Sequence, residues 1–357
     1  MVVVHVVEAF GGGVYSYLKD LCTFSSKLTD IKTVIIYSSK RKEIDVNKVD
    51  IISNANIELL NIDMERSIDP IKDAKSIFKL RAALKLIKPD IVHLHSSKAG
   101  ILGRVACFGI INSNQVFYSP HGYSFLSHEF SSSKKKLFYY IEKIAQKIFG
   151  GTTVACGDTE FEIASKIGKS VLVRNGIVPS RLEKYQKDIS NERLKIGTLG
   201  RISLQKNPSL FNQIAQKYPE YDFVWIGDGE LKQHLTSKNI DVTGWTTDFD
   251  LVMQHLSTLD VYMQTSSWEG LPIAIIEAMA LKKPVVATNI IGNKDVVAHG
   301  KTGYLFNEID ELDTIFSLLE DNDCRNTLGT SGYKRCISLF NSDTNFNQLL
   351  SIYFSKQ

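Results

Sequence analysis

The chain has 357 residues, of which 43% are hydrophobic, and its formal net charge is +3. This length and hydrophobic content are enough to bury two cores and favour two or three domains. The net charge is too small to indicate a nucleic-acid-binding protein. The cysteines show no CxxC spacing, which indicates buried or free thiols in a reducing compartment and not a disulfide framework or a zinc site. They are Cys22, Cys107, Cys156, Cys324 and Cys336.

No secretory signal or membrane span is expected from the sequence. The chain opens directly into a strand-like run at residues 2–7, with no basic segment or long apolar core before it. No uninterrupted apolar run reaches the roughly 18 residues that a membrane span needs. We therefore expect a cytoplasmic protein, which could still bind peripherally to the inner face of the plasma membrane.

Apolar, β-branched runs alternate with helical patterns, which is typical of parallel sheets built from βαβ units. Turn-forming residues at 176–180 mark the expected domain boundary. We expect two facing, Rossmann-like doubly wound α/β domains, residues 1–178 and 179–340, with a cleft between them. The predicted strands are residues 2–7, 32–37, 91–94, 116–119, 153–155 and 170–173 in the first half, and residues 195–199, 223–226, 261–264, 284–287 and 304–306 in the second.

A glycine turn follows the first predicted strand. Gly11, Gly12 and Gly13 would let backbone N–H groups approach a phosphate at the N-terminus of the next helix. The third glycine of the dinucleotide fingerprint GxGxxG is missing. A tight turn without a ligand explains the glycines equally well.

The third predicted strand carries two histidines, and a further histidine follows the fourth strand. We expect His93 and His95 to point to opposite sides, with one of them buried. His121 precedes Gly122 after a strand, so its imidazole is expected to point into the cleft.

A helix predicted to begin at Ser133 is clearly amphipathic. Its apolar face would contain Leu137, Ile141, Ile144 and Ile148, flanked by Phe138, Tyr140 and Ala145. The opposite face would contain Glu142, Lys143, Gln146 and Lys147. One interpretation is a surface helix that packs its apolar face on the sheet. The other is a cationic surface that meets anionic lipid headgroups, through Lys134, Lys135, Lys136, Lys143 and Lys147.

Two cations follow the first strand of the second half. Arg201 comes directly after Gly200, and Lys206 lies a few residues further on. Both would emerge at the carboxyl end of a strand, where open α/β sheets bind their ligands. A guanidinium and an ammonium group together suit a diphosphate and stabilise it as it leaves.

Two glutamates eight residues apart are the most informative feature of the second half. Glu269 lies in a loop after a predicted strand, and Glu277 lies inside a predicted helix with Pro272 near its first turn. The N-terminus of that helix would carry free N–H groups. Carboxylates suit sugar and ribose hydroxyls, which donate hydrogen bonds.

Residues 248–250 form a DxD pattern, which in some sugar-nucleotide enzymes holds a divalent ion. Here Asp248 opens a predicted helix, so a helix cap is the simpler interpretation. We predict no metal site and no cofactor.

Taken in their order along the chain, these motifs resemble those of the family-4 retaining glycosyltransferases of the GT-B fold. The resemblance covers nearly the whole chain. The matching pieces are Phe10-Gly11-Gly12-Gly13, Tyr118-Ser119-Pro120-His121-Gly122, Val173-Arg174-Asn175-Gly176-Ile177, Gly200-Arg201 with Lys206, Ile226-Gly227-Asp228-Gly229-Glu230, and Ser266-Ser267-Trp268-Glu269-Gly270-Leu271-Pro272 through Glu277. The resemblance also implies that a C-terminal helix, about residues 341–357, packs back on the first domain.

The resemblance implies that the second domain binds a nucleotide-sugar, with UDP favoured over GDP. Glu277 would accept hydrogen bonds from the ribose hydroxyls. Arg201 and Lys206 would hold the diphosphate and stabilise it as the leaving group. Glu269 would hold the sugar hydroxyls, together with the N–H groups near Gly270 and Leu271.

On the first domain, the resemblance places Gly12 and Gly13 beside the donor diphosphate and His121 near the transferred sugar, where it would hydrogen-bond a hydroxyl. The expected acceptor-side residues are His95, Ser96 and Lys98. No carboxylate of this domain is placed as a nucleophile, which favours front-face attack with retention. The expected acceptor is a polyprenyl-diphosphate-linked saccharide or another saccharide. The group transferred to it would be a hexose or an N-acetylhexosamine. The expected role is in the biosynthesis of a bacterial polysaccharide such as a capsule or O-antigen.

Two other classes remain open at this point. A sugar-nucleotide epimerase can share the two-domain architecture and would react without an acceptor. A catalytically silent nucleotide-sugar-binding protein is the second, although the presence of Arg201, Lys206, Glu269 and Glu277 argues against it. A nicotinamide oxidoreductase is disfavoured by the missing glycine and ribose-binding acid.

Overall fold

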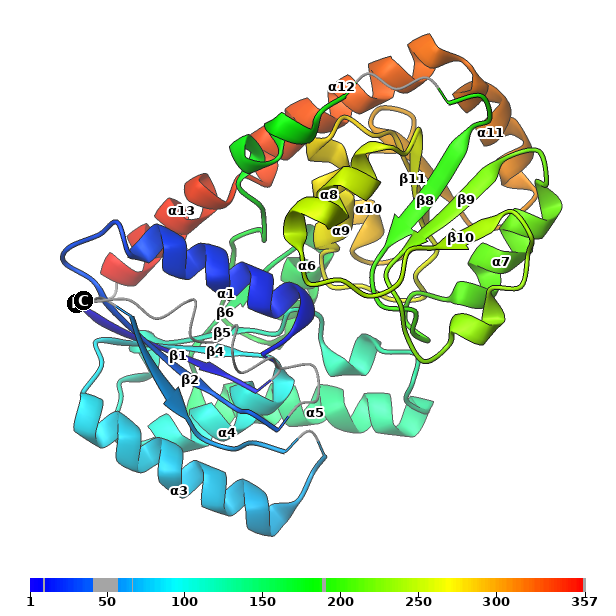
Figure 1. The fold of residues 1–357 in the computed structure, drawn as a ribbon. Coiled ribbons are helices and arrows are strands. Elements are labelled where there is room, and N and C mark those ends of the chain that lie inside the picture. The colour runs from blue at the N-terminus through cyan, green and yellow to red at the C-terminus, as the bar shows by residue number, and fades with distance from the viewer. Residues whose placement is uncertain (9, 41–56, 66, 188–190, 356–357) are drawn as a thin grey trace. The chain divides into compact units, whose positions relative to one another are not determined.

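Two parallel sheets organise the computed structural model, which describes residues 1–8, 10–40, 57–65, 67–187 and 191–355 (Figure 1). Each sheet lies in its own unit. Unit 1 contains Met1–Asn175 and Ser342–Gln357, and unit 2 contains Gly176–Asn341. The chain therefore passes between the units close to the expected boundaries at residues 178 and 340.

Among the described residues, unit 1 is built on a seven-stranded sheet with the order β3-β2-β1-β4-β5-β6-β7. The register places His5 of β1 beside His93 of β4. The near-continuous apolar sequences of β1 and β2 suit strands that are covered on both faces. The strands are β1 (Val2–Val7), β2 (Lys32–Tyr37), β3 (Ile57–Asn61), β4 (Ile91–His95), β5 (Val116–Ser119), β6 (Thr152–Ala155) and β7 (Ser170–Leu172).

Helices cover both faces of this sheet (Figure 1). On one face, α1 (Gly12–Ser25) and α13 (Ser342–Phe354) share an apolar cluster that contains Leu18 and Leu349. On the other face, Leu80, Leu102 and Ala164 belong to a second cluster. The helices on that face are α3 (Pro70–Ile87), α4 (Ser97–Cys107), α5 (Ser132–Phe149) and α6 (Asp158–Ile167), with the short turns η1 (Ser113–Gln115) and η2 (Ser124–Leu126) between them. The C-terminal helix thus completes the core of unit 1.

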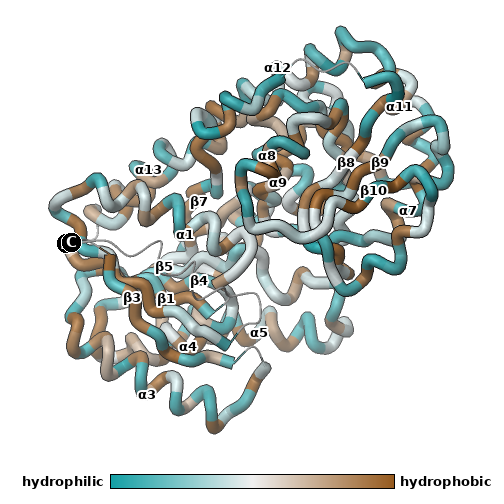
Figure 2. The backbone as a smooth tube through the Cα atoms, in the orientation of Figure 1, coloured by the Kyte–Doolittle hydropathy of each residue, from teal (hydrophilic) through white to brown (hydrophobic). Residues whose placement is uncertain are grey.

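Unit 2 contains a six-stranded parallel sheet with the order β10-β9-β8-β11-β12-β13. On one face, Phe211 and Phe316 pack with Trp225 in an apolar cluster. The strands are β8 (Lys195–Leu199), β9 (Asp222–Ile226), β10 (Ile240–Val242), β11 (Val261–Gln264), β12 (Val285–Thr288) and β13 (Gly303–Phe306). The helices are α7 (Pro208–Lys217), α8 (Phe249–Ser257), α9 (Ile273–Ala280), α10 (Asn293–Val296), α11 (Glu311–Glu320) and α12 (Asn322–Leu339), with η3 (Pro179–Arg181), η4 (Glu183–Tyr185) and η5 (Lys232–His234). Figure 2 shows a hydrophobic stretch along β9, as expected for a strand covered by helices.

The two α/β Rossmann-like sheets confirm the predicted fold class. Two strands were not predicted, and both lie at the edge of a sheet. β3 is only partly buried along Ile57–Asn61, and no residue of β10 is fully buried. An edge strand needs no continuous apolar run, so the periodicity that identifies central strands is missing there.

The packing of α5 contradicts the interpretation that this helix packs its apolar face on the sheet. Its buried residues are Glu142, Ala145 and Gln146, whereas Leu137 and Ile144 are each 54% exposed. The polar side chains face inward because Arg104 of α4 needs partners: its guanidinium donates to Glu142 at 3.4 Å and to Gln146 at 3.0 Å. The predicted apolar stripe therefore faces outward.

Within the described part of the chain, no helix is both long enough and apolar enough to cross a membrane.

Candidate active site

Both sheets contain a point at which the strand order changes direction. In unit 1 this point lies between β1 and β4, and in unit 2 between β8 and β11. The loops that leave two such strands diverge to opposite sides and open a crevice at the carboxyl ends of the strands. The residues that follow β8 and β11 are therefore the first candidates for a site in unit 2.

The segment after β8 lies close to the segment after β9. Gly227 has φ +136°, and a Cβ atom there would lie 2.3 Å from the carbonyl oxygen of Gly200. Any side chain at Gly227 would push the two segments apart. Arg201 follows Gly200, and its Nε donates to Glu230 Oε2 at 3.0 Å. The Arg201 side chain is 47% exposed, so its charge remains accessible at this edge of the sheet.

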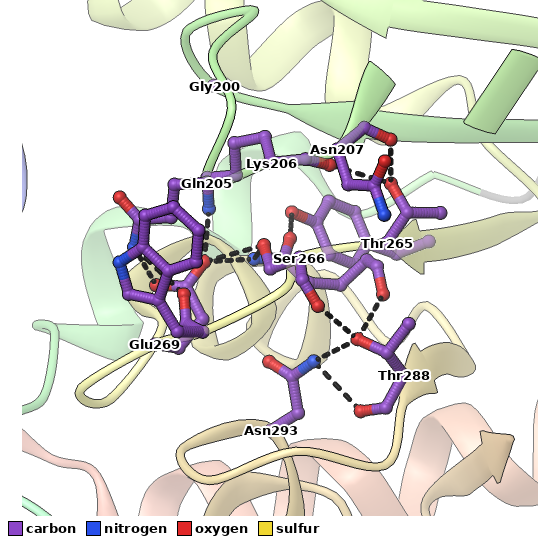
Figure 3. A network of polar contacts seen from close by, with 12 residues as sticks. Gly200, Gln205, Lys206, Asn207, Thr265, Ser266, Glu269, Thr288 and Asn293 are labelled. Carbon is purple, nitrogen blue, oxygen red and sulfur yellow. Dashed lines mark hydrogen bonds and ion pairs between the residues drawn. The ribbon is translucent and has the colours of Figure 1, made fainter. Parts of the chain in front are cut away.

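Lys206 and Glu269 form the centre of a polar network (Figure 3). The Nζ atom of Lys206 lies 2.8 Å from Glu269 Oε1, and the two side chains are 17% and 9% exposed. The same oxygen accepts hydrogen bonds from Gln264 Nε2 at 2.8 Å and Ser266 Oγ at 2.7 Å. Gln205 Nε2 donates to the other carboxylate oxygen at 3.1 Å. Glu269 thus has four protein donors.

A second tier of this network ties the loops after β11 and β12 together (Figure 3). Thr288 Oγ1 donates to the carbonyl oxygen of Ser266 at 2.6 Å, and Asn293 Nδ2 donates to Thr288 Oγ1 at 3.1 Å. Gly292 has φ +86°, and a Cβ there would lie 2.6 Å from the carbonyl oxygen of Gly270. The position of Glu269 is therefore set by both loops. Sequence reasoning did not identify Gln205, Gln264, Thr288, Gly292 or Asn293 as site residues, and it gave Ser266 only as part of a matching motif.

Glu277 lies on α9, which begins directly after Pro272, as the sequence predicted. Its side chain is partly buried. Burial raises the pKa of Tyr262 on β11, and the charges of Glu269 and Glu277 raise it further. Both glutamates therefore lie near the same buried tyrosine. Gly270 and Leu271 follow Glu269 and lead into α9, which carries Glu277.

The DxD pattern is confirmed as a helix cap. The carboxylate of Asp248 accepts hydrogen bonds from the backbone N–H groups of Asp250 at 2.9 Å and Leu251 at 3.3 Å. Asp250 itself pairs with Lys184 at 3.4 Å and accepts a hydrogen bond from Tyr185. These contacts account for the two carboxylates without an ion.

In unit 1, the glycine turn lies at the start of α1. Gly12 and Gly13 are exposed, and Gly12 has φ +54°. Lys98, expected on the acceptor side, lies in the first turn of α4. Its Nζ atom pairs with Asp73 at 2.7 Å and donates to the carbonyl oxygen of Ser67 at 2.8 Å. Ser96 has φ +78°, a backbone conformation that costs energy for a residue with a Cβ atom.

The expectation that His93 and His95 point to opposite sides was wrong. Residues two apart on a strand share a face, and the two rings stack with centroids 4.3 Å apart. Both are fully buried. Together with His5 they place ring nitrogens within 4.8 Å of one another, as a metal site would. However, His5 Nδ1 bonds His95 Nε2, and the two nitrogens of His93 bond Tyr353 and Ser119. Hydrogen bonds within the core therefore account for this cluster.

The two units are Rossmann-like α/β folds with polar residues at the switch point of each sheet. Comparison with known proteins identifies the family. Residues 180–335 match the family model "Glycosyl transferases group 1", and residues 21–156 match "Glycosyl transferase 4-like". A UDP-Gal:alpha-D-GlcNAc-diphosphoundecaprenol alpha-1,3-galactosyltransferase of Escherichia coli is 31% identical over an alignment of 322 residues, and the match covers 81% of this chain and 81% of its own. The capsular polysaccharide biosynthesis glycosyltransferase CapM of Staphylococcus aureus is 26% identical over 88% of this chain and 90% of its own. The chain belongs to the group 1, family-4-like glycosyltransferases and is a glycosyltransferase.

Solved structures agree on the fold. Sucrose-phosphate synthase of Thermosynechococcus elongatus superposes with a TM-score of 0.81 at 15% identity, covering 99% of this chain and 98% of its own. HepE of Anabaena, solved in complex with UDP, gives a TM-score of 0.78 at 18% identity, covering 99% of this chain and all of its own. These structures confirm the predicted GT-B fold.

Proposed function

We propose that the protein transfers a hexose or N-acetylhexosamine from a UDP-sugar to a lipid-linked saccharide, with retention at the anomeric carbon, in the synthesis of a bacterial surface polysaccharide. The observation that carries this proposal is the position of two cations in a glycosyltransferase: Arg201 and Lys206 both follow β8, which lies at the switch point of the sheet in unit 2. The choice of substrates is supported by the Escherichia coli relative, whose name gives UDP-galactose as donor and a diphosphoundecaprenol-linked sugar as acceptor.

The donor diphosphate would bind between the two cations. Arg201 is half-exposed and can turn from Glu230 towards a phosphate, because an exposed ion pair contributes little to stability. Lys206 is held in place by Glu269 and keeps further N–H donors for a phosphate oxygen. Glu277 would accept hydrogen bonds from the ribose hydroxyls. The cations stabilise the negative charge that grows on the departing diphosphate.

In the reaction, the bond between the anomeric carbon and the diphosphate oxygen breaks while the acceptor oxygen bonds the same face of that carbon. The departing phosphate oxygen takes the proton of the acceptor hydroxyl. In this scheme the main role of Glu269 differs from the expected contact with the sugar hydroxyls. Since its carboxylate already accepts four protein hydrogen bonds, its first contribution is to position Lys206, and contact with the sugar hydroxyls comes second.

We propose that no metal ion is required. The two cations can neutralise the diphosphate, and the carboxylates of Asp248 and Asp250 are engaged in a helix cap and in contacts with η4. Treatment with EDTA should leave the rate of transfer unchanged. Loss of activity that magnesium restores would refute this part of the proposal.

The lipid-linked acceptor would be reached from a membrane surface bound by α5. Its outward face carries Leu137, Tyr140, Ile144 and Ile148, and Lys143 is exposed beside them. Lys134, Lys136 and Lys147 are exposed on the same helix, whereas Lys135 is partly buried. Apolar side chains flanked by lysines fit the boundary between acyl chains and anionic headgroups. The occupant of this face is therefore an anionic lipid surface.

α3 extends the same surface. It packs against the other side of α4 and exposes Ile71, Phe78 and Leu86, which are 84%, 73% and 85% exposed. Lys75 and Lys79 lie exposed on this helix. Two cationic, partly apolar helices on one layer of unit 1 bind a flat anionic surface better than either alone.

A thermal-shift screen tests the donor assignment. Binding to the folded state raises the unfolding midpoint, so UDP and UDP-sugars should raise it by a few degrees at millimolar concentration, more than GDP or ADP does. The shift should disappear in Arg201→Ala. An equal shift with all three nucleotides, or none with UDP, would refute the assignment of a UDP-sugar.

A further inference from the structure

Four histidines of unit 1 gather at the switch point of its sheet. His5 lies on β1, His93 and His95 lie on β4, and His121 follows β5. The rings of His95 and His121 stack with centroids 5.3 Å apart and an interplanar angle of 16°. His121 has φ +52°, an uncommon conformation for a residue with a side chain. This strained position holds its ring against His95.

Three of these histidines form a continuous hydrogen-bonded chain. Asn175 Nδ2 lies 3.3 Å from His121 Nδ1, His121 Nε2 lies 3.0 Å from His95 Nδ1, and His95 Nε2 lies 2.9 Å from His5 Nδ1. His121 and Asn175 are partly and fully buried, respectively. Both ring nitrogens of His121 are thus bonded inside unit 1, so a substrate hydroxyl can bond a ring nitrogen only by displacing one of these partners.

The direction of the chain follows from its outer end. The amide nitrogen of Asn175 can only donate, so His121 Nδ1 accepts and Nε2 carries the proton. His121 then donates to His95, and His95 donates to His5. Each ring carries one proton in this arrangement. Burial favours this neutral state, because it lowers the pKa of His121 to about 4 and of His5 to about 3, and holds that of His95 well below its usual value.

The contact with Asn175 is the longest of the three and the one on the outer side of His121. We propose that His95, backed by His5, is a positioning residue that holds His121 in the Nε2–H tautomer, so that Nδ1 accepts a hydrogen bond from a substrate hydroxyl that displaces the Asn175 amide. This inference rests on the proposed function, because the hydroxyl belongs to the donor sugar or to the saccharide acceptor. Towards the substrate, His121 is thereby assigned as a hydrogen-bond acceptor, while its Nε2–H donates to His95.

Nitrogen-15 NMR of the histidine rings tests the tautomer directly in the whole protein. The His121 signal, identified by its loss in His121→Asn, should show a protonated Nε2 and an unprotonated Nδ1 at pH 7.5. A protonated Nδ1 would overturn the proposal, since it requires every link of the chain to run in the opposite direction, with the amide of Asn175 turned over.

Two replacements of His95 separate positioning from packing. His95→Asn places an amide oxygen near the position of Nδ1 and should keep both the tautomer and the activity, within about threefold. His95→Phe keeps the ring but removes the acceptor, so kcat/KM for transfer should fall about tenfold, the worth of one hydrogen bond. In a His121→Ala background, His95→Phe should cause no further loss, because the two residues act as one unit. A further tenfold loss there would show a merely structural role.

The source of the hydroxyl follows from donor hydrolysis measured without acceptor. If the hydroxyl belongs to the donor sugar, His95→Phe lowers hydrolysis and transfer alike. If it belongs to the acceptor, only transfer falls. A wild-type protein that transfers nothing from any sugar nucleotide would refute the proposed function, while the tautomer measurement would still decide the hydrogen-bond direction. If His95→Phe does not fold, the wild-type spectrum and His95→Asn decide the question.

Discussion

At the scale of single residues, the site in unit 2 depends on charges and hydrogen bonds that converge on one carboxylate. Glu269 is 9% exposed and is bonded by Lys206, Gln205, Gln264 and Ser266. The carboxylate of Glu269 fixes the positions of these four side chains, in addition to any contact with a ligand. Its replacement therefore affects stability and catalysis together.

We predict that Glu269→Gln lowers the free energy of unfolding by about 1–3 kcal/mol, because the new amide group faces hydrogen-bond donors and leaves the partly buried ammonium group of Lys206 without its carboxylate. Urea unfolding of the purified variant measures this. Glu230→Gln is the matched control, since it removes the exposed partner of Arg201 and should change stability little. Equal stability of both variants would show that the network around Glu269 contributes nothing.

Arg201→Ala should lower kcat by roughly two orders of magnitude, because the guanidinium stabilises the leaving diphosphate more than the bound donor. Steady-state kinetics with the preferred UDP-sugar measures this loss. Arg193 provides the control, as its side chain has nearly the same exposure and pairs with Asp222 at 3.1 Å on the same unit. Arg193→Ala should retain wild-type kcat. A similar loss in both variants would exclude a specific role of Arg201.

Sequence reasoning predicted the charged residues of this candidate site and missed most of the amide and hydroxyl side chains around them. Arg201, Lys206 and Glu269 stand out because a charge at the end of a buried strand is unusual. Gln264 and Asn293 do not, because amide side chains are common in loops. Their partners are set by the order of β8, β11 and β12 in the sheet, which one strand's sequence does not contain. The prediction for His93 and His95 was wrong because it misapplied strand geometry. Their spacing of two residues, which places both side chains on one face of a strand, is visible in the sequence.

At the scale of elements, α5 shows that an amphipathic pattern can be predicted correctly while the face that it buries is predicted wrongly. The amphipathic period was visible in the sequence, but the buried face is the polar one. The reason lies on α4 and β5: Arg104 and Tyr118 are fully buried, and Glu142 bonds both of them. Such a network depends on neighbours far along the chain, so the sequence of α5 alone favours the opposite orientation.

We predict that the outward face of α5 binds anionic vesicles. Ile144→Glu should reduce sedimentation with phosphatidylglycerol-containing liposomes at low salt several-fold, because it places a negative charge within the apolar stripe. Leu318→Glu is the control, since Leu318 is 45% exposed on α11 of unit 2. If wild-type protein does not sediment with these liposomes, or if both variants lose binding equally, α5 is not the membrane surface.

At the scale of the whole molecule, each unit places its polar groups at the switch point of its sheet. The fold class followed from the alternation of strands and helices, and the central strands were placed within one or two residues of their observed bounds, for example Lys195–Leu199. The strand order did not follow, because it depends on contacts between segments and not on their periodicity. The switch points, at which both candidate sites lie, were therefore visible only in the structure.

The buried histidines predict how the stability of unit 1 depends on pH. Burial lowers the pKa of His5, His93, His95 and His121 in the folded state, whereas in the unfolded chain they titrate near their ordinary value of about 6.5. Below that pH the unfolded state binds more protons, so stability falls as pH falls, by up to roughly 1.4 kcal/mol per pH unit for each histidine. The loss continues towards pH 4, where His121 begins to bind a proton in the folded state.

Urea unfolding at pH 7.5, 6.5 and 5.5 measures this dependence. The midpoint should fall moderately between the first two values, because the histidines of the unfolded chain are half protonated at pH 6.5, and fall more steeply between the last two. A midpoint that is constant down to pH 5.5 would show that these histidines are not held neutral in the folded protein.

Direct assay of transfer tests the central claim most closely. The purified protein is incubated with each common UDP-sugar and a polyprenyl-diphosphate-linked N-acetylglucosamine in anionic vesicles, and the lipid extract is analysed by mass spectrometry and proton NMR. We predict a product heavier by one hexose or N-acetylhexosamine, with the anomeric configuration of the donor. An inverted linkage would contradict the proposed mechanism, and isomerised UDP-sugar without any lipid product would identify the protein as an epimerase instead.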